Sequence, residues 1–221
     1  MSEPDADLPR PAAVIFDLDG TLVDTVGARI EAWLAVFAEE GIPADRRHVS
    51  ELIGADGRRL AGEVAERAGI ELEPGRDEAI DARSGRLFAE LNQRPRPLPG
   101  FRDLRQRLES KGVPWAIATS SRREQVTTSV DALGLTTQQV VVDGSHVEHA
   151  KPAPDLLLLA ARELDAAPPR CWYVGDATWD MLAAVAAGMV GIGVTTGAVD
   201  AATLRSAGAS HVVGTLAELE V

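Results

Sequence analysis

The chain has 221 residues, 45% of them hydrophobic, and its 34 Asp and Glu outnumber its 22 Lys and Arg, which gives a formal net charge of −12. This length accommodates one α/β domain with a smaller inserted domain, and so acidic a surface excludes nucleic acid and anionic membranes as main partners. A single cysteine, Cys171, excludes an intrachain disulfide. Because the sequence has neither a signal peptide nor an apolar run of roughly 18 residues, we expect a cytoplasmic protein.

Short apolar runs alternate with longer amphipathic segments over most of the chain, a pattern typical of βαβ units and a parallel sheet. The runs predict strands at residues 12–16, 114–118, 140–142, 171–174 and 190–194, with a short edge segment at 212–213. The spacing of Gly191, Gly193 and Gly197 does not match the GxGxxG of a dinucleotide site. The expected fold class is therefore α/β, with a doubly wound, Rossmann-like parallel sheet.

Residues 24–94 break this alternation, because they contain no strand-like run. Apolar residues instead recur at helical spacing in three stretches, at residues 30–37, 60–68 and 80–91. The proline-rich segment 94–100 then predicts a stiff, extended linker. We expect an all-helical domain over residues 24–94, inserted into a core domain that is formed by residues 1–23 and 95–221.

Polar residues follow four of the predicted strands, at or just beyond the point where each strand ends. The set holds four carboxylates, two hydroxyls and one amine, from Asp17, Asp19, Thr119, Ser120, Lys151, Asp176 and Asp180. In an open parallel sheet the carboxyl ends of the strands line one crevice, where ligands bind. We therefore expect these side chains to converge on a single site.

Clustered carboxylates repel one another, and a hard divalent cation relieves that repulsion. Mg²⁺ takes oxygen ligands in near-octahedral geometry and keeps positions for water and a substrate phosphate. We expect the side chains of Asp17 and Asp176 to bind it, together with the backbone carbonyl of Asp19.

A carboxylate can attack phosphorus once the phosphoryl charge is offset, and water then hydrolyses the resulting acyl phosphate. Asp17 is the candidate nucleophile, and Asp19 is the candidate group that protonates the leaving oxygen and later deprotonates water. Lys151, the Thr119 hydroxyl and backbone N–H groups near Ser120 are the candidate phosphate ligands.

The four segments resemble the ordered motifs of the haloacid dehalogenase superfamily, as Asp17-Leu18-Asp19-Gly20-Thr21, Thr119-Ser120, Lys151-Pro152 and Gly175-Asp176 with Asp180. The resemblance covers nearly the whole chain, because the expected helical insert is similar to the small helical cap of that superfamily. It implies the same nucleophile, acid/base and phosphate-binding residues, with Asp176 as a metal ligand. It also implies that Asp180 supports the metal shell or orients the lysine.

Three features narrow the reaction class that this resemblance implies, and a fourth is a small departure from the family's motifs. Asp19 argues for phosphoryl transfer, because carbon–halogen dehalogenases of the superfamily typically lack the second Asp. Arg29 stands where β-phosphoglucomutases typically have His, and residues 24–94 contain no lysine for the Schiff base of the phosphonatases. Ala177 replaces a Ser that is common in the fourth motif, which affects the tuning of the metal site. The chain thus resembles the phosphoglycolate phosphatase and β-phosphoglucomutase-like subgroup.

The expected partner is a small phosphorylated metabolite, such as phosphoglycolate or a sugar phosphate, and the expected assembly is a monomer or homodimer. The segment 53–59 occupies the place of the cap's specificity loop, so Gly54, Arg58 and Arg59 are candidate substrate contacts. A solvated helix start explains the two arginines equally well. A β-phosphoglucomutase-like phosphomutase and a non-catalytic phospho-acceptor switch are the alternatives to a phosphatase.

Overall fold

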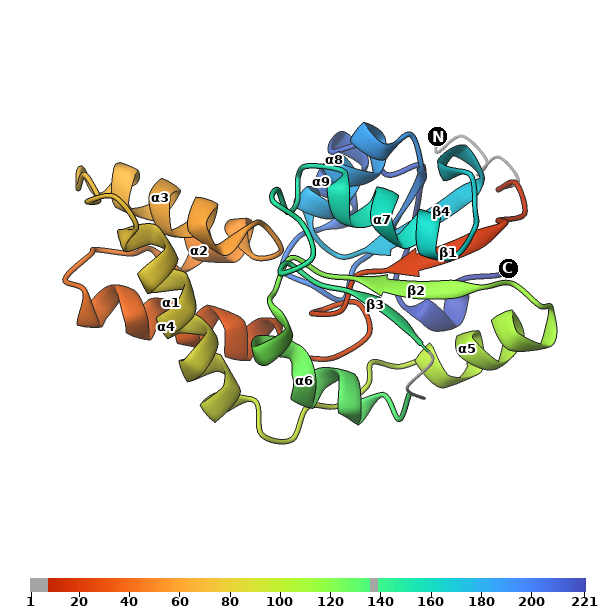
Figure 1. Cartoon of the computed structure of the whole chain (residues 1–221), viewed down its shortest axis with the longest axis horizontal. Helices are drawn as coiled ribbons and strands as arrows, with labels where there is room; N and C mark the ends of the chain where they lie inside the picture. Colours follow the sequence, from red (N-terminus) through yellow and green to blue (C-terminus); the bar gives the residue numbers. More distant parts are fainter. Residues whose placement is uncertain (1–7, 136–138) are drawn as a thin grey trace.

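A six-stranded parallel sheet with the order β3-β2-β1-β4-β5-β6 forms the centre of the protein (Figure 1). It is seen in a computed structural model that describes residues 8–135 and 139–221. The strands are β1 (Ala13–Phe16), β2 (Trp115–Ala118), β3 (Val140–Val142), β4 (Cys171–Gly175), β5 (Val190–Val194) and β6 (His211–Val213). The expected doubly wound α/β fold is confirmed, and every strand lies within one residue of its predicted bounds.

Helices cover both faces of the sheet, so each inner strand is buried on both sides and reads as a continuous apolar run. In β1, Val14 and Phe16 join the apolar core on one face, whereas Ala13 and Ile15 join the core on the other. The first core is closed by α5 (Phe101–Ser110) and α6 (Arg123–Ala132), and the second by α7 (Asp155–Glu163) and α8 (Thr178–Ala187). The last helix, α9 (Ala201–Ser206), packs beside β5 and β6.

Of the five helices between β1 and β2 in the sequence, the first four form a separate body at one end of the molecule, which we call the cap (Figure 1). They are α1 (Val26–Glu39), α2 (Arg46–Leu52), α3 (Gly57–Arg67) and α4 (Arg76–Leu91), and they share an apolar core of their own. The sequence pattern predicts three of them but not α2. That helix has seven residues, and only Val49 and Leu52 are buried, so it is too short to show a helical period.

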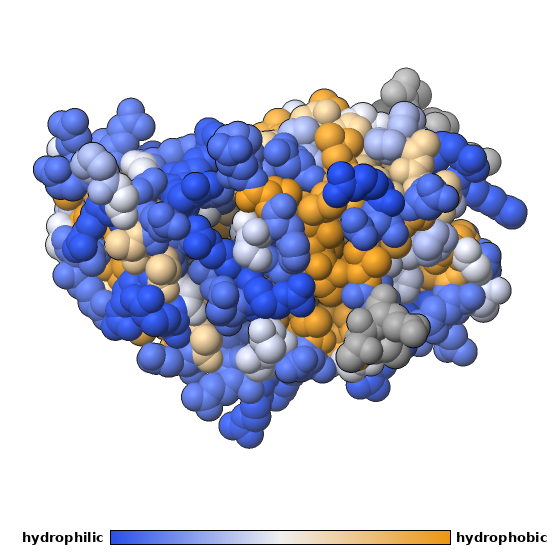
Figure 2. All heavy atoms as spheres, in the orientation of Figure 1, coloured by the Kyte–Doolittle hydropathy of each residue, from blue (hydrophilic) through white to orange (hydrophobic). Residues whose placement is uncertain are grey.

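The surface differs between the two bodies. In Figure 2 the cap is mostly hydrophilic, while apolar atoms gather over the core near α7 and β3. Leu158 on α7 is one of the exposed large apolar side chains. Among the described residues, every helix is too short or too polar to span a bilayer.

The chain leaves β1 for β2 on one side and returns to β4 on the other, which makes the gap between β1 and β4 the switch point of the sheet. In open α/β sheets, ligands bind at the carboxyl ends of the strands beside this point. The cap extends from the same edge, because it begins ten residues after Phe16, at Val26.

Candidate active site

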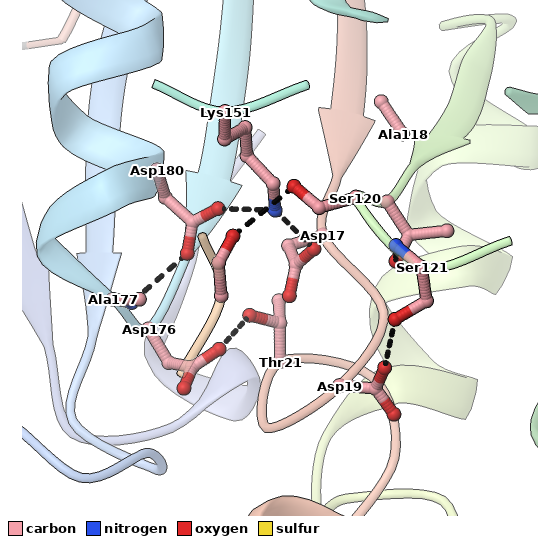
Figure 3. A network of polar contacts seen from close by, with 12 residues as sticks. Asp17, Asp19, Thr21, Ala118, Ser120, Ser121, Lys151, Asp176, Ala177 and Asp180 are labelled. Carbon is pink, nitrogen blue, oxygen red and sulfur yellow. Dashed lines mark hydrogen bonds and ion pairs between the residues drawn. The ribbon is translucent and has the colours of Figure 1, made fainter. Parts of the chain in front are cut away.

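The strand-end residues that the sequence predicts do gather at the carboxyl edge of the sheet (Figure 3). Asp17 follows β1, Thr119 follows β2 and Asp176 follows β4, which places β1 in the middle of the three. Lys151 reaches the same point from the loop between β3 and α7, and Asp180 reaches it from the first turn of α8. The predicted convergence of these segments is therefore present in the structure.

Lys151 is fully buried and bridges two carboxylates. Its Nζ donates to Asp17 Oδ1 at 2.5 Å and to Asp180 Oδ1 at 2.7 Å. Burial lowers the pKa of Lys151, but the Asp17 and Asp180 carboxylates more than offset this and raise it well above its ordinary value. The lysine is therefore a fixed positive charge beside the candidate nucleophile.

Asp180 is held on both of its oxygens. Besides Lys151, its Oδ1 is 3.1 Å from the Tyr173 hydroxyl, and its Oδ2 accepts the backbone N–H of Ala177 at 2.9 Å. The second interaction uses only backbone atoms of residue 177, so it is independent of the Ser-to-Ala departure at that position. Asp180 is thus bonded to the lysine, as the lysine-orienting role expected for it requires.

Asp176 lies in a close-fitting pocket, with 3% of its surface exposed. Its Oδ1 accepts a hydrogen bond from Thr21 Oγ1 at 2.7 Å. Two glycines enclose Oδ2, because a Cβ atom on Gly20 would come within 2.4 Å of it and a Cβ atom on Gly197 within 1.8 Å. The two glycines therefore make the space that this carboxylate occupies.

This donor set fits a divalent cation. Oxygens of Asp17, Asp176 and Asp180 lie within 4.8 Å of one another, and all three residues are buried. Burial and the neighbouring carboxylates raise the pKa of Asp176 well above its ordinary value. Burial likewise raises the pKa of Asp17 to about 7, although Lys151 opposes the shift. Such raised pKa values mark a group of acids in which added positive charge stabilises the ionised forms.

Asp19 lies apart from this carboxylate group (Figure 3), and its carboxylate is bonded to residues at the start of the cap. Its Oδ1 accepts from Thr25 Oγ1 at 2.6 Å, and its Oδ2 accepts from Arg29 Nη2 at 2.7 Å and from Ser121 Oγ at 3.4 Å. Asp17 and Asp19 line the same cavity from different sides. The structure therefore separates the two carboxylates, so that one faces Lys151 and the other the cap.

The second motif supplies hydroxyls to the cavity and also touches the cap. Thr119 is buried, and Thr119 and Ser120 line the cavity together with Lys151. Ser120 Oγ donates to the backbone carbonyl of Gly54 at 3.1 Å. Gly54 has a φ of +95°, a backbone conformation that favours glycine. The predicted cap residue Gly54 thus lies at the cavity, in contact with the core.

Arg58 and Arg59 do not line this cavity, which differs from the expectation that one of them faces the substrate. Arg58 folds back onto the residue that caps its own helix, with Nη2 3.0 Å from Asp56 Oδ2. Arg59 pairs with Glu63 one turn along the helix, with Nε 2.6 Å from Oε1. Local carboxylates thus bind both guanidinium groups outside the cavity that Asp17 lines.

Other residues at the site do not follow from the strand-end pattern. Tyr173 lies within β4, and Thr25 and Arg29 reach Asp19 from the start of the cap. Gly197 lies just after β5, so extending the strand-end rule to the fifth strand finds it. Asp81, on α4, also lines the cavity, and no sequence motif marks it.

Comparison with known proteins agrees with this geometry. The family model described as haloacid dehalogenase-like hydrolase matches residues 14–194. The chain is 32% identical to fructose-1-phosphate phosphatase YqaB of Escherichia coli over 189 residues, which is 84% of this chain and 97% of that protein. It is 33% identical to phosphoglycolate phosphatase of Shigella boydii over 204 residues, covering 83% and 81% of the two chains.

A solved structure shares the whole architecture. The crystal structure of a hydrolase from Pseudomonas syringae superposes with a TM-score of 0.90 at 31% identity, covering 93% of this chain and 94% of that one. The match spans both the sheet and the cap, since it includes nearly all of each chain. Motifs, site geometry and fold together place this chain in the haloacid dehalogenase-like hydrolase family.

Proposed function

We propose that this protein is a Mg²⁺-dependent phosphatase that hydrolyses a small phosphorylated metabolite through an aspartyl-phosphate on Asp17. The observation that carries this proposal is the meeting of Asp17, Asp176 and Lys151 at one point of the sheet edge. An acidic protein that binds a phosphate needs concentrated local positive charge. This site offers one fixed ammonium group and a set of carboxylates suited to a cation.

Three groups would hold the Mg²⁺ ion, namely the side chains of Asp17 and Asp176 and the backbone carbonyl of Asp19. Asp180 is less suited, because Lys151, Tyr173 and the Ala177 N–H occupy its oxygens. When bound, the cation offsets the charge of the phosphoryl group and of the carboxylate that approaches it.

The side chains divide the reaction between them. An Asp17 carboxylate oxygen attacks phosphorus, and the bond from phosphorus to the ester oxygen breaks as Asp19 gives that oxygen a proton. Lys151 and the Thr119 hydroxyl bind phosphoryl oxygens and stabilise the charge that they carry in the transition state. Asp19 then takes a proton from water, whose oxygen attacks phosphorus, so that inorganic phosphate leaves and Asp17 is restored.

The cap supports this proposal, because it covers the cavity and contacts the core around it. The backbone N–H of Asp56 donates to the carbonyl of Lys151 at 3.0 Å, and Trp179 Nε1 on α8 donates to the carbonyl of Glu51 at 3.0 Å. A closed cap excludes bulk water and strengthens electrostatic interactions inside the site. A cavity enclosed in this way suits a small metabolite rather than a macromolecule.

Phosphate release from p-nitrophenyl phosphate, with and without Mg²⁺, tests the proposal. We expect wild-type activity to require Mg²⁺ and Asp17→Asn to lose at least about 10³-fold in kcat, as expected when a nucleophile is removed. Asp24→Asn is the matched control, because Asp24 is exposed and lies in the same segment. Equal rates for wild type and Asp17→Asn would refute the nucleophile assignment.

The products formed by the same purified protein distinguish a phosphatase from the two alternative functions. A phosphomutase would return an isomerised sugar phosphate with little free phosphate. A phospho-acceptor switch would accumulate a phosphoprotein that persists for many minutes in Mg²⁺. We expect neither, because we assign the activation of water to Asp19, which lines the cavity together with Asp17.

A further inference from the structure

The wall of the cavity that faces Asp17 belongs largely to the cap, and it determines what the rest of the substrate meets. Two of the cavity-lining residues carry a positive charge, Lys151 and Arg29. Lys151 is already bound between two carboxylates. Under the proposed function, Lys151 binds the phosphate group of the substrate. Arg29 is then the remaining cationic residue of the cavity that could bind a second anionic group of the substrate.

Arg29 is buried, and its guanidinium group is paired with a carboxylate. Its Nε and Nη2 donate to Asp19 Oδ2 at 3.2 and 2.7 Å, and its guanidinium carbon lies 3.5 Å from the centre of the Phe88 ring. The ring and the carboxylate fix the guanidinium group in this position. Arg29 therefore holds Asp19, and the Asp19 carboxylate balances its charge within the cavity wall.

The same wall presents a carboxylate, Asp81 on α4, which is half-buried. A Cβ atom on Gly57 would come within 2.0 Å of Asp81 Oδ1, so the start of α3 leaves room for this carboxylate only because residue 57 has no side chain. Burial raises the pKa of Asp81 above its ordinary value, although Arg122, Arg29 and the Gln125 side chain oppose the shift. Hydrogen-bond donors from a ligand would stabilise this poorly solvated group.

Neutral polar side chains complete the wall. Ser84 on α4 and Gln125 on α6 line the cavity near Asp81, and Ser121 lines it beside Asp19. Hydroxyl and amide groups both donate and accept hydrogen bonds, whereas an ionised carboxylate only accepts them. A hydroxyl-bearing chain can satisfy all of these groups together, but a carboxylate would meet Asp81 as a like charge.

We propose that the substrate is a phosphate ester of a neutral polyhydroxylated compound, a sugar or polyol, with a hydroxyl group that donates to Asp81. The same residue disfavours substrates that carry a carboxylate in place of these hydroxyls. This inference rests on the proposed phosphatase function and names the substrate class within it. Asp81 is then a specificity-determining residue of the cap.

Steady-state kinetics with three substrates test this proposal. The probes are sorbitol 6-phosphate, phosphoglycolate and p-nitrophenyl phosphate, and the readout is kcat/KM for wild type and Asp81→Asn. We expect wild type to prefer sorbitol 6-phosphate to phosphoglycolate. Asp81→Asn should lose about 10- to 100-fold toward sorbitol 6-phosphate, the effect of losing a hydrogen bond to a charged group. Its activity on phosphoglycolate should hold or rise, and any loss on p-nitrophenyl phosphate, which has no hydroxyl chain, should be smaller than the loss on sorbitol 6-phosphate.

Glu78→Gln is the matched control, because it removes one charge from α4 one turn before Asp81. Glu78 Oε1 lies 2.8 Å from Arg122 Nη2 across the cap–core boundary and does not line the cavity. A change that only loosens cap closure should alter all three substrates by a common factor, and we expect Glu78→Gln to do no more than this.

Two outcomes would overturn the inference while leaving the phosphatase assignment intact. One is a wild-type preference for phosphoglycolate, and the other is an equal loss on all three substrates in Asp81→Asn. If wild type and Asp17→Asn were equally inactive on every probe, the proposed function itself would fail, and this inference with it.

Discussion

Substituting Gly197 by alanine places a methyl group where the Asp176 carboxylate now lies. The new Cβ atom would be 1.8 Å from Oδ2 and 2.6 Å from Cγ of Asp176. Real Cβ atoms essentially never approach other heavy atoms closer than 3.0 Å, so the carboxylate and the loop must separate by about 1.2 Å. A functional site tolerates displacements of about 0.5 Å, so this shift is large enough to disturb a metal ligand.

The expected cost follows from the role proposed for Asp176. Losing a residue that positions a metal ligand typically weakens metal binding by about 10- to 100-fold. At about 1.4 kcal/mol for each factor of ten, this corresponds to about 1.4 to 2.8 kcal/mol of binding free energy. The three atoms nearest to the new methyl group all belong to Asp176, so catalysis at saturating Mg²⁺ should largely survive.

A Mg²⁺ titration of p-nitrophenyl phosphate hydrolysis measures this effect. We expect Gly197→Ala to raise the half-saturating Mg²⁺ concentration by about 10- to 100-fold. Gly62→Ala is the matched control, because a Cβ atom there meets nothing within 4 Å, and it should titrate like wild type. If Gly197→Ala remains folded and its half-saturation is unchanged, Asp176 is not a metal ligand and the reasoning is refuted.

Three further predictions concern charge at the site. In the absence of metal, the Lys151→Met variant should lose about 3–5 kcal/mol of unfolding free energy, measured in urea at pH 8. The substitution leaves the buried carboxylates of Asp17 and Asp180 without their cationic partner. Lys111→Met, at an exposed lysine, is the control, and equal losses would contradict the buried bridge. Burial raises the pKa of Asp17 from 3.8 to about 7, so its protonated form stabilises the metal-free protein at low pH, and this contribution disappears as pH rises through 7. Mg²⁺ binds the ionised form, so its increase of Tm should be larger at pH 8 than at pH 5.5; equal increases would argue against this linkage. Arg58→Ala should change kcat/KM by less than about threefold, because a half-exposed ion pair contributes little. A tenfold loss would indicate that Arg58 contacts the substrate after all.

The fold could be read from the sequence because its signals are local. An apolar run such as Val14-Ile15-Phe16 is buried on both faces wherever a parallel sheet is covered by helices, and its end fixes where Asp17 stands. The rule that strand ends share one edge then brought Lys151 and Asp176 into the same site without any knowledge of their contacts. The helix α2 was not predicted, because its two buried residues are too few to show a helical periodicity.

The predicted substrate contacts of the cap show what local sequence patterns cannot predict. The sequence marks a loop at residues 53–59, and Gly54 does lie at the cavity. It does not reveal that Asp56, which caps α3, also takes up the guanidinium group of Arg58. Which of several arginines turns toward the substrate depends on such competing partners, and the competition is decided only once the helices have packed.

The sequence by itself therefore determined the sheet, the helical insert and the acids, hydroxyls and lysine at the strand ends, because apolar spacing and strand ends are properties of contiguous residues. Tertiary structure alone decided that Arg29 binds Asp19, that Gly197 makes room for Asp176 and that Asp81 faces the cavity. These contacts join separate elements, and they depend on how side chains are directed when those elements pack. No pattern along the chain encodes that direction, which is why the residues at the sheet edge could be predicted and their partners from the cap could not.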